Sequence, residues 1–282
     1  MTVEPRSERG GREWTVSVNG TEQRVKEVGT GAQTVVFSPN PFTNRALFDA
    51  PMAALRGDYR CISYDHRGQG ESGFGAPQPS PDLLGTEGLY DDALALLDEL
   101  GIDTCHWVGS SIGGFVGARL AARHPDRIRS LILLGFTTRR LSQKDVRQVE
   151  MMIAMVRASR LLRPLGAAVH QRVTEQIMTN MFGATFMTDP ARAEDRDLWR
   201  ERFTAMVVPE AAPMIRSVFG HPGTPPELLA QIQAPTLIIG GEEERGGLDD
   251  VLQAQRVIPD ARLVTIPGAG HMVLVEQPDA GT

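Results

Sequence analysis

The chain has 282 residues, a formal net charge of −6, 41% hydrophobic residues and two cysteines. That length fits one large domain, or a core that carries an insertion. The mild acidity argues against nucleic acid or an anionic membrane as the main partner, and two cysteines are too few for a disulfide scaffold, which favours a reducing, cytoplasmic compartment.

The sequence predicts neither a signal peptide at the N-terminus nor a membrane-spanning segment. Residues 1–12 are polar and lack the apolar core of a signal peptide, so we expect none. No apolar run reaches the length needed to cross a bilayer. We also find no cluster of metal-ligating residue types, so we expect no metal and no membrane partner.

Strand and helix patterns alternate along most of the chain. Apolar or alternating patterns predict strands at residues 14–18, 23–28, 33–37, 59–64, 105–109, 130–134, 235–240 and 261–266. Helical spacing predicts helices at residues 46–55, 89–100, from 112 onward, and at 248–258. Asn19-Gly20 marks a tight hairpin between the first two strands. This alternation predicts an α/β fold with a mostly parallel central sheet flanked by helices.

The alternation stops between residues 138 and 226, where only helical spacing is found. Pro164, Pro190, Pro209 and Pro213 punctuate these helices, and eight of the eleven methionines lie here. We therefore predict a helical cap at 138–226 inserted into a core made of 1–137 and 227–282. The methionines either line an apolar pocket or serve ordinary helix packing, and the sequence favours neither.

A glycine-flanked serine lies where a predicted strand gives way to a predicted helix. The stretch Gly109-Ser110-Ser111-Ile112-Gly113 has the spacing G-x-S-x-G, which is typical of a strand-to-helix elbow. Small neighbours permit the strained turn, and the helix N-terminus that follows offers N–H groups to a developing oxyanion. The spacing alone arises easily by chance, so its value comes from the strand before it, the helix after it and suitable partners downstream.

A serine hydroxyl becomes a strong nucleophile only when a base takes its proton. His271 is the preferred candidate because it stands in a glycine-rich loop at a strand end, and His66 is the second candidate. The other four histidines are His106 and His124, which are interpreted as structural, and His170 and His221, which lie in the insertion.

The base needs an acid that fixes its tautomer and stabilises its charged form. The strand at 235–240 runs into Gly241-Glu242-Glu243-Glu244, from which an acid can reach a histidine after the next strand. We choose Glu244. The alternative acids are Glu243, Asp249 and Asp250, and the alternative interpretation of the run is a solvated acidic loop.

Four stretches in this order resemble the α/β-hydrolase fold superfamily. They are the elbow at 109–113; Asp65-His66-Arg67-Gly68-Gln69-Gly70-Glu71-Ser72, similar to D-x-R-G-x-G-x-S; Gly241-Glu242-Glu243-Glu244, similar to G-x-x-D; and Gly270-His271 with Glu276 and Pro278, similar to G-H-x-x-x-x-E-x-P. The resemblance runs from about Val35 to Pro278 and matches the insertion only in general character. Enol-lactonases and small carboxylesterases with a helical cap are the most similar members.

The resemblance implies a serine hydrolase that cleaves a small ester or lactone without a metal or organic cofactor. Ser111 would be the nucleophile. Epoxide hydrolases and haloalkane dehalogenases of this fold carry aspartate at that position, so Ser111 argues against both activities. The N–H groups of Ile112 and Asn40 would form the oxyanion hole. Two departures stand out: Ser38-Pro39 replaces the frequent His-Gly before the oxyanion residue, and glutamate stands at the acid position where aspartate is commoner.

Two other functions remain open at this stage. One is a different reaction on the same triad, namely C–C bond hydrolysis, thioester cleavage or cofactor-free perhydrolysis. The other is ligand binding or non-hydrolytic biosynthetic catalysis.

Arg139 and Arg140 are candidates for binding a substrate carboxylate, with a solvated pair as the alternative. The expected partner is a small-molecule substrate, and a homo-oligomer is compatible with the sequence.

Overall fold

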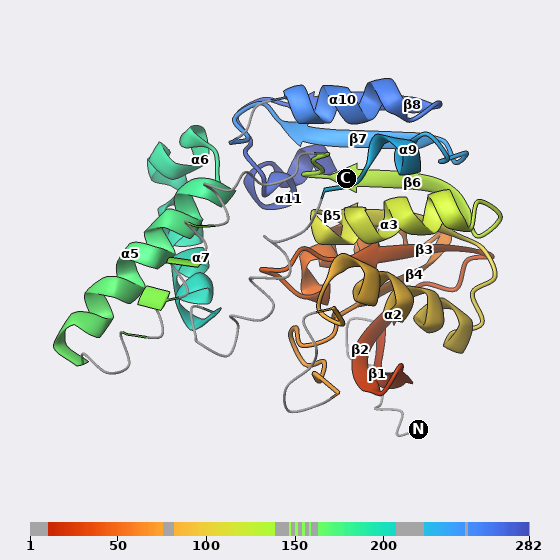
Figure 1. Cartoon of the computed structure of the whole chain (residues 1–282), viewed down its shortest axis with the longest axis horizontal. Helices are drawn as coiled ribbons and strands as arrows, with labels where there is room; N and C mark the ends of the chain where they lie inside the picture. Colours follow the sequence, from red (N-terminus) through yellow and green to blue (C-terminus); the bar gives the residue numbers. More distant parts are fainter. Residues whose placement is uncertain are drawn as a thin grey trace.

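The computed structural model describes residues 11–75, 82–138, 163–206, 223–245 and 248–281, with a few single positions between 147 and 158. Eight strands form one sheet in the order β1-β2-β4-β3-β5-β6-β7-β8 (Figure 1). Their bounds are β1 (Gly11–Val18), β2 (Thr21–Val28), β3 (Gln33–Ser38), β4 (Tyr59–Tyr64), β5 (Cys105–Ser110), β6 (Ile128–Leu134), β7 (Thr236–Gly241) and β8 (Ala261–Ile266). β1 and β2 pair antiparallel, β2 is antiparallel to β4, and every other pair is parallel. The predicted mostly parallel sheet is confirmed.

Helices cover both faces of the sheet, so its central strands are buried on both sides. The core helices are α1 (Asp49–Leu55), α2 (Thr86–Glu99), α3 (Ile112–Arg123), α9 (Pro226–Leu229), α10 (Asp249–Val257) and α11 (Val273–Glu276). Alternate strand residues divide between two apolar clusters: Val36 and Trp107 pack with α2 and α3, whereas Val35 and Val108 pack with α1. A side chain of this size contributes roughly 1.5–3 kcal/mol when fully buried.

The predicted helix at 46–55 is wrong in one detail. The segment begins as a single 3-10 turn, η1 (Arg45–Phe48), and only then continues as α1. Pro51 is the third residue of α1, where its missing N–H removes no intrahelical bond. Asn44 caps the 3-10 turn by accepting a hydrogen bond from the Ala46 N–H.

The described part of the predicted cap is helical. It comprises α5 (Arg163–Met181), α6 (Ala184–Thr188), the 3-10 turn η2 (Pro190–Arg192) and α7 (Ala193–Met206), which lie beyond one end of the sheet (Figure 1). The cap boundaries at 137/138 and 226/227 remain predictions, because 139–146 and 207–222 lie outside the described residues.

An apolar cluster of its own joins the cap to the core. Its buried members are Phe42, Val173, Ile177, Met178, Phe182, Phe186, Trp199, Phe203 and Met272. Phe42 follows β3 and Met272 follows β8, so the loops after two sheet strands reach into the cap. Met178 is fully buried in this cluster, which favours packing over a pocket lining at that position.

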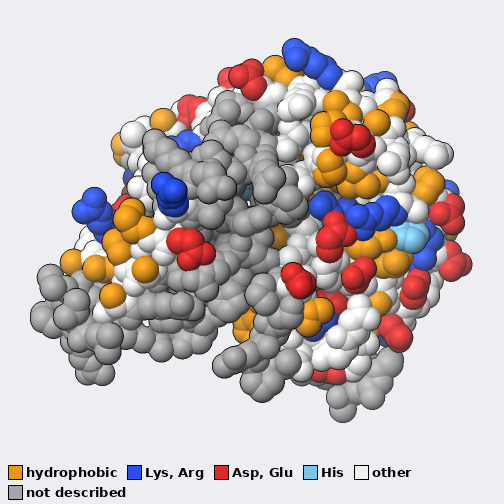
Figure 2. Space-filling view, viewed as in Figure 1, with side chains coloured by type: hydrophobic (Ala, Val, Ile, Leu, Met, Phe, Trp, Pro, Cys, Tyr) orange, Lys and Arg blue, Asp and Glu red, His pale blue; other side chains and the backbone are white. Residues whose placement is uncertain are grey.

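Cys61 and Cys105 are free and buried, and burial raises the pKa of their thiols to about 11 and about 12. On the face shown in Figure 2, acidic and basic side chains are interspersed over the sheet domain, which lies on the right. Of the helices in the described ranges, none is both long and apolar enough to cross a membrane. Nor do those ranges contain three His, Cys, Asp or Glu side chains grouped to hold a metal ion.

Candidate active site

The predicted elbow is present between β5 and α3. Ser111 has φ 52° and ψ −112°, a conformation that costs a non-glycine residue about 1–3 kcal/mol. The flanking glycines are required sterically: a Cβ on Gly109 would lie 2.3 Å from the Gly113 carbonyl oxygen, and one on Gly113 would lie 2.2 Å from the Ser38 carbonyl oxygen. The Ser111 N–H donates to the Leu134 carbonyl at 2.8 Å, which fixes the turn to the neighbouring strand.

Two backbone donors near the elbow are available to a ligand. Within the described ranges, no hydrogen bond uses the N–H of Ile112, the first residue of α3, or the N–H of Asn40. The Asn40 loop is held instead through its other atoms. The Asn40 Oδ1 accepts from the Phe42 N–H at 2.9 Å, and its carbonyl accepts from the Gln69 side chain at 3.2 Å.

His271 and Glu244 are brought together from the loops after β8 and β7. The His271 Nδ1 lies 2.6 Å from the Glu244 Oε1, with side-chain exposures of 15% and 10%. A carboxylate accepts only, so we assign the proton to Nδ1, which leaves Nε2 as an acceptor. Burial disfavours the imidazolium, but the charge and hydrogen bond of Glu244, with the charge of Glu276, raise the pKa of His271 above its ordinary value.

The imidazole of His271 lies against the backbone beside the elbow. A Cβ on Gly135 would lie 3.0 Å from the His271 Cε1, and Gly135 directly follows Leu134, the acceptor of the Ser111 N–H. The Ser111 hydroxyl makes no hydrogen bond to any described residue. The serine–histidine link is therefore open in this structure, which is common for catalytic groups without a bound substrate.

The alternative acids occupy other positions. Glu243 accepts from the Thr185 N–H at 2.7 Å and from the Thr185 hydroxyl, and these bonds lower the pKa of Glu243. Asp249 is the exposed first residue of α10. The side chain of Asp250 lies outside the described residues.

His66, the second candidate for the base, lies beneath the Asn40 loop. It is buried, and its Nε2 lies 3.1 Å from the Pro39 carbonyl and 3.2 Å from the Ser38 hydroxyl. Burial lowers the pKa of His66 to about 4, so the ring stays neutral near pH 7. The geometry favours a supporting role, because an Nε2 that donates to Pro39 cannot also accept a proton from a nucleophile.

Contacts between the cap and the His271 loop could not be foreseen from the sequence. The N–H groups of His271 and Met272 both donate to the Met181 carbonyl at the end of α5, at 3.1 and 3.2 Å. Backbone contacts across about 90 residues leave no side-chain pattern for sequence reasoning to detect.

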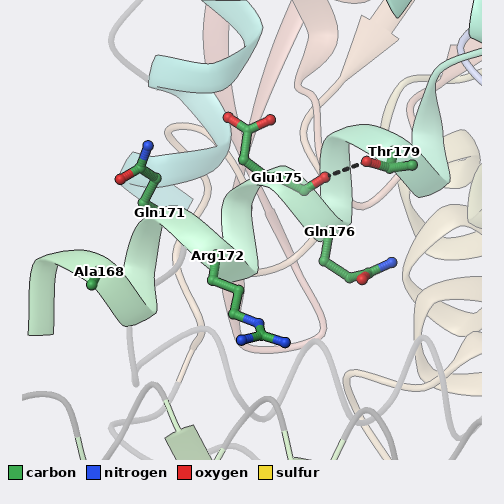
Figure 3. Close-up of a pocket in the computed structure, with 6 residues that line it drawn as sticks. All are labelled: Ala168, Gln171, Arg172, Glu175, Gln176 and Thr179. Atoms are coloured by element: carbon green, nitrogen blue, oxygen red, sulfur yellow. Dashed lines mark hydrogen bonds between the residues drawn. The ribbon is translucent and has the colours of Figure 1, made fainter. Parts of the chain in front are cut away.

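The remaining candidates lie elsewhere. Arg139 and Arg140 fall outside the described residues, so their predicted role stays a prediction. An open hollow on α5 is lined by Ala168, Gln171, Arg172, Glu175, Gln176 and Thr179 (Figure 3). All six come from one helix and none is a predicted site residue, so we do not assign the chemistry to this hollow.

Comparisons with known proteins place the chain in a family. The sequence model of the family described as alpha/beta hydrolase fold matches residues 38–278. An enol-lactonase from Burkholderia xenovorans LB400 is 26% identical with a TM-score of 0.77, covering 95% of this chain and 96% of that one. A hydrolase from Pseudomonas aeruginosa PA01 is 27% identical with a TM-score of 0.75, covering 95% and 94%.

Curated relatives match a shorter stretch. A putative carbamate hydrolase RutD of Caulobacter sp. (strain K31) is 34% identical over 103 residues, which cover 36% of this chain and 37% of the relative. The karrikin insensitive 2 receptor IA of Petunia hybrida is 31% identical over 127 residues, or 43% and 44%. The chain thus spans well under half the length of the curated relatives it matches.

Proposed function

This chain belongs to the alpha/beta hydrolase fold family, and on that basis we propose that it is a serine hydrolase that cleaves a small carboxylic ester or lactone through an acyl-enzyme on Ser111. The observation that carries the proposal is the hydrogen bond of 2.6 Å between the His271 Nδ1 and the Glu244 Oε1, beside an elbow serine with φ 52°. The enol-lactonase neighbour, which aligns over nearly its whole length, supports the ester or lactone class.

The first half of the reaction forms the acyl-enzyme. The His271 Nε2 accepts the Ser111 proton as the serine Oγ bonds to the acyl carbon, and the carbonyl oxygen becomes an oxyanion. The N–H groups of Ile112 and Asn40 donate to that oxyanion, and removal of one such donor costs about 3–4 kcal/mol in other enzymes. The imidazolium then protonates the leaving alkoxide as the bond to the acyl carbon breaks.

The second half releases the acid. His271 takes a proton from water, the hydroxide oxygen bonds to the acyl carbon, and the serine leaves with the proton returned by His271. Glu244 accepts from Nδ1 throughout, which keeps Nε2 facing the reaction and stabilises the imidazolium. A lactone differs only in that the leaving alkoxide remains tethered to the acyl group. No step requires a metal or an organic cofactor.

Turnover on a substrate panel tests this proposal. The panel contains 4-nitrophenyl acetate, an enol lactone, an N-acyl carbamate, a thioester and a vinylogous diketone, each assayed with wild type and Ser111→Ala. Faster turnover of the ester or lactone than of the other classes, lost in Ser111→Ala, is the expected result. Preferred cleavage of the diketone or thioester would move the activity to another reaction on the same groups.

A carbamate is in the panel because curated relatives that match about a third of the chain are named as putative carbamate hydrolases. A carbamate also presents an electrophilic carbonyl carbon to Ser111, but that carbon is bonded to both oxygen and nitrogen, so loss of the alkoxide would leave a carbamoyl group on the serine. Carbamate turnover exceeding that of the ester and lactone, again lost in Ser111→Ala, would select that class.

Ligand binding without turnover is the rival from a different class. Two observations favour testing it: the Ser111 hydroxyl bonds no residue that the structure describes, and one relative is named as a receptor. Tight binding of a panel compound that is not consumed, with affinity unchanged in Ser111→Ala, would select binding over hydrolysis.

A further inference from the structure

The corner between α5 and α6 meets the His271 loop backbone to backbone. A Cβ placed on Gly270 would lie 2.4 Å from the Gly183 nitrogen, and one on Gly183 would lie 2.9 Å from the Gly270 nitrogen. These separations leave no room for a side chain at either position. The cap corner and the loop that carries the base are therefore in direct contact.

One buried carboxylate bridges the two segments. Glu276, at the end of α11, is 1% exposed. Its Oε2 accepts from the Gly183 N–H at 2.7 Å and from the Gly270 N–H at 2.9 Å, and its Oε1 accepts from the Met272 N–H at 3.0 Å. The two loop donors are the immediate neighbours of His271 in the chain, one on each side.

The acid loop is attached to the same corner. Glu243 precedes Glu244 and bonds Thr185 at the start of α6, while the His271 N–H donates to the Met181 carbonyl. Met181, Gly183 and Thr185 thus contact the loops of both members of the His271–Glu244 pair. Movement of this corner would move both loops.

We propose that Glu276 is a positioning residue for His271. Its carboxylate accepts hydrogen bonds from the residues on either side of His271 and from Gly183 of the α5–α6 corner, and so fixes the position of the His271 loop relative to the cap. This inference rests on the proposed function, because it takes His271 as the base. Glu276 bonds no side chain of the predicted triad, and it acts on the reaction only through the His271 backbone and through its charge.

The pKa of His271 depends on the charged groups around it, so this pKa can be measured independently of the reaction rate. Glu244 faces the imidazole from the acid loop and Glu276 from α11, and both raise the pKa of His271. From the cap, Arg192 donates to the carbonyls of Val275 and Glu276. From the acid loop, Glu243 accepts a hydrogen bond from the Thr185 N–H. Replacement of Glu276 by glutamine removes one of the two negative charges, so the pKa of His271 should fall.

The test compares wild type with Glu276→Gln, Gly183→Ala and Asp92→Asn. Glu276→Gln keeps the size of the side chain. It replaces one carboxylate oxygen, which accepts from a backbone N–H, by an NH2 group that cannot accept that hydrogen bond. Gly183→Ala retains the Glu276 charge and adds a Cβ that would lie 2.9 Å from the Gly270 nitrogen and 2.5 Å from the Glu243 Oε2, so it pushes the corner away from both the His271 loop and the acid loop. Asp92→Asn is the matched control, because it removes another buried carboxylate, one that pairs with Arg67 and is not among the groups that shift the pKa of His271.

Two measurements are made below the unfolding temperature of every variant. The first is the rate constant for labelling of Ser111 by diisopropyl fluorophosphate as a function of pH. The second is the NMR titration of the His271 ring, assigned by its loss in His271→Ala. Glu276→Gln should label about 10- to 100-fold more slowly, with its pH midpoint and NMR pKa moved lower. Gly183→Ala should label more slowly with the midpoint unchanged, and Asp92→Asn should match wild type in both.

Failure of this inference differs from failure of the proposed function. If Glu276→Gln labels within twofold of wild type and the His271 titration does not move, Glu276 is only a structural carboxylate and the inference is wrong. If wild type itself is not labelled, the proposed function fails, while the NMR titration still decides whether Glu276 acts on His271. If Glu276→Gln does not fold, Gly183→Ala decides: labelling at the wild-type rate overturns the inference.

Discussion

The proposed nucleophile Ser111 and the proposed base His271 are held in different ways. Ser111 is fixed by the sheet: its N–H bonds β6, and the elbow packs against the end of β3 without room for a Cβ at Gly113. The His271 loop is fixed from outside the sheet, through Met181 and Gly183 of the cap and the bridging Glu276. Ser111 is thus held by the sheet, whereas the proposed base His271 is held in part by the helical segment that we predict to be a cap. If the proposed function holds, changes in that segment should alter catalysis without touching the elbow.

The largest expected effect comes from removal of the base. His271→Ala should lower turnover of the best panel substrate about 100,000-fold, because the serine then has no proton acceptor. The variant leaves the largely buried Glu244 carboxylate without its partner, so the free energy of unfolding should also fall by about 1–3 kcal/mol. The measurement is kcat with denaturant unfolding in parallel. Turnover within tenfold of wild type would show that another group serves as the base.

The acid should matter next. In Glu244→Gln the amide can donate to Nδ1 and favour the wrong tautomer, so kcat should fall about 1,000- to 10,000-fold. Wild-type activity needs the neutral imidazole and is lost as pH falls through the raised pKa of His271. Removal of the Glu244 charge lowers that pKa, so the acid limb should move to lower pH. A pH–rate profile whose acid limb stays in place would contradict the pairing of His271 with Glu244.

A methyl group added at Gly113 tests how tightly the elbow packs against the sheet. Gly113→Ala places a Cβ 2.2 Å from the Ser38 carbonyl oxygen, so the free energy of unfolding should drop by about 2–3 kcal/mol. Gly240→Ala is the matched control in β7, since its Cβ would meet nothing closer than 3.6 Å. Denaturant unfolding measures both. Equal effects at the two glycines would mean that the elbow is no tighter than an ordinary strand.

The last expected effect concerns His66, and it develops only as the pH falls below 6.5. Burial holds the pKa of His66 at about 4, below its ordinary value, so the unfolded chain binds this proton first. The stability that His66 contributes is present above pH 6.5 and is lost as pH falls toward 4, by about 3 kcal/mol in all. His66→Gln, which can still donate to Pro39, should show a flatter stability–pH curve over that range. Parallel curves for wild type and variant would contradict the neutral buried imidazole.

The sequence allowed the elbow and the sheet to be predicted because their signals are local. Gly109, Ser111 and Gly113 lie within five residues, and the apolar strand patterns mark the parallel core directly. Glu244 was chosen from its place after a strand, and it lies at hydrogen-bond distance from His271. The catalytic roles of these residues, and of Ile112 and Asn40, remain predictions.

What could not be predicted depends on contacts between distant segments. Gly183 and Glu276 are 93 residues apart, and they meet through a backbone N–H that has no signature in the sequence. His66 follows a predicted strand, which makes it a candidate base in the sequence, but its surroundings have no local signature; the structure shows it beneath the Asn40 loop, bonded to Pro39. The 3-10 turn before α1 was missed because helical spacing does not distinguish a tighter turn from the first turn of an α-helix.

The most direct test of an activated Ser111 is the intact mass of the protein after treatment with diisopropyl fluorophosphate. The account predicts one adduct on wild type, none on Ser111→Ala and strongly slowed labelling of His271→Ala. No adduct on wild type, or an adduct that persists in Ser111→Ala, would contradict the account.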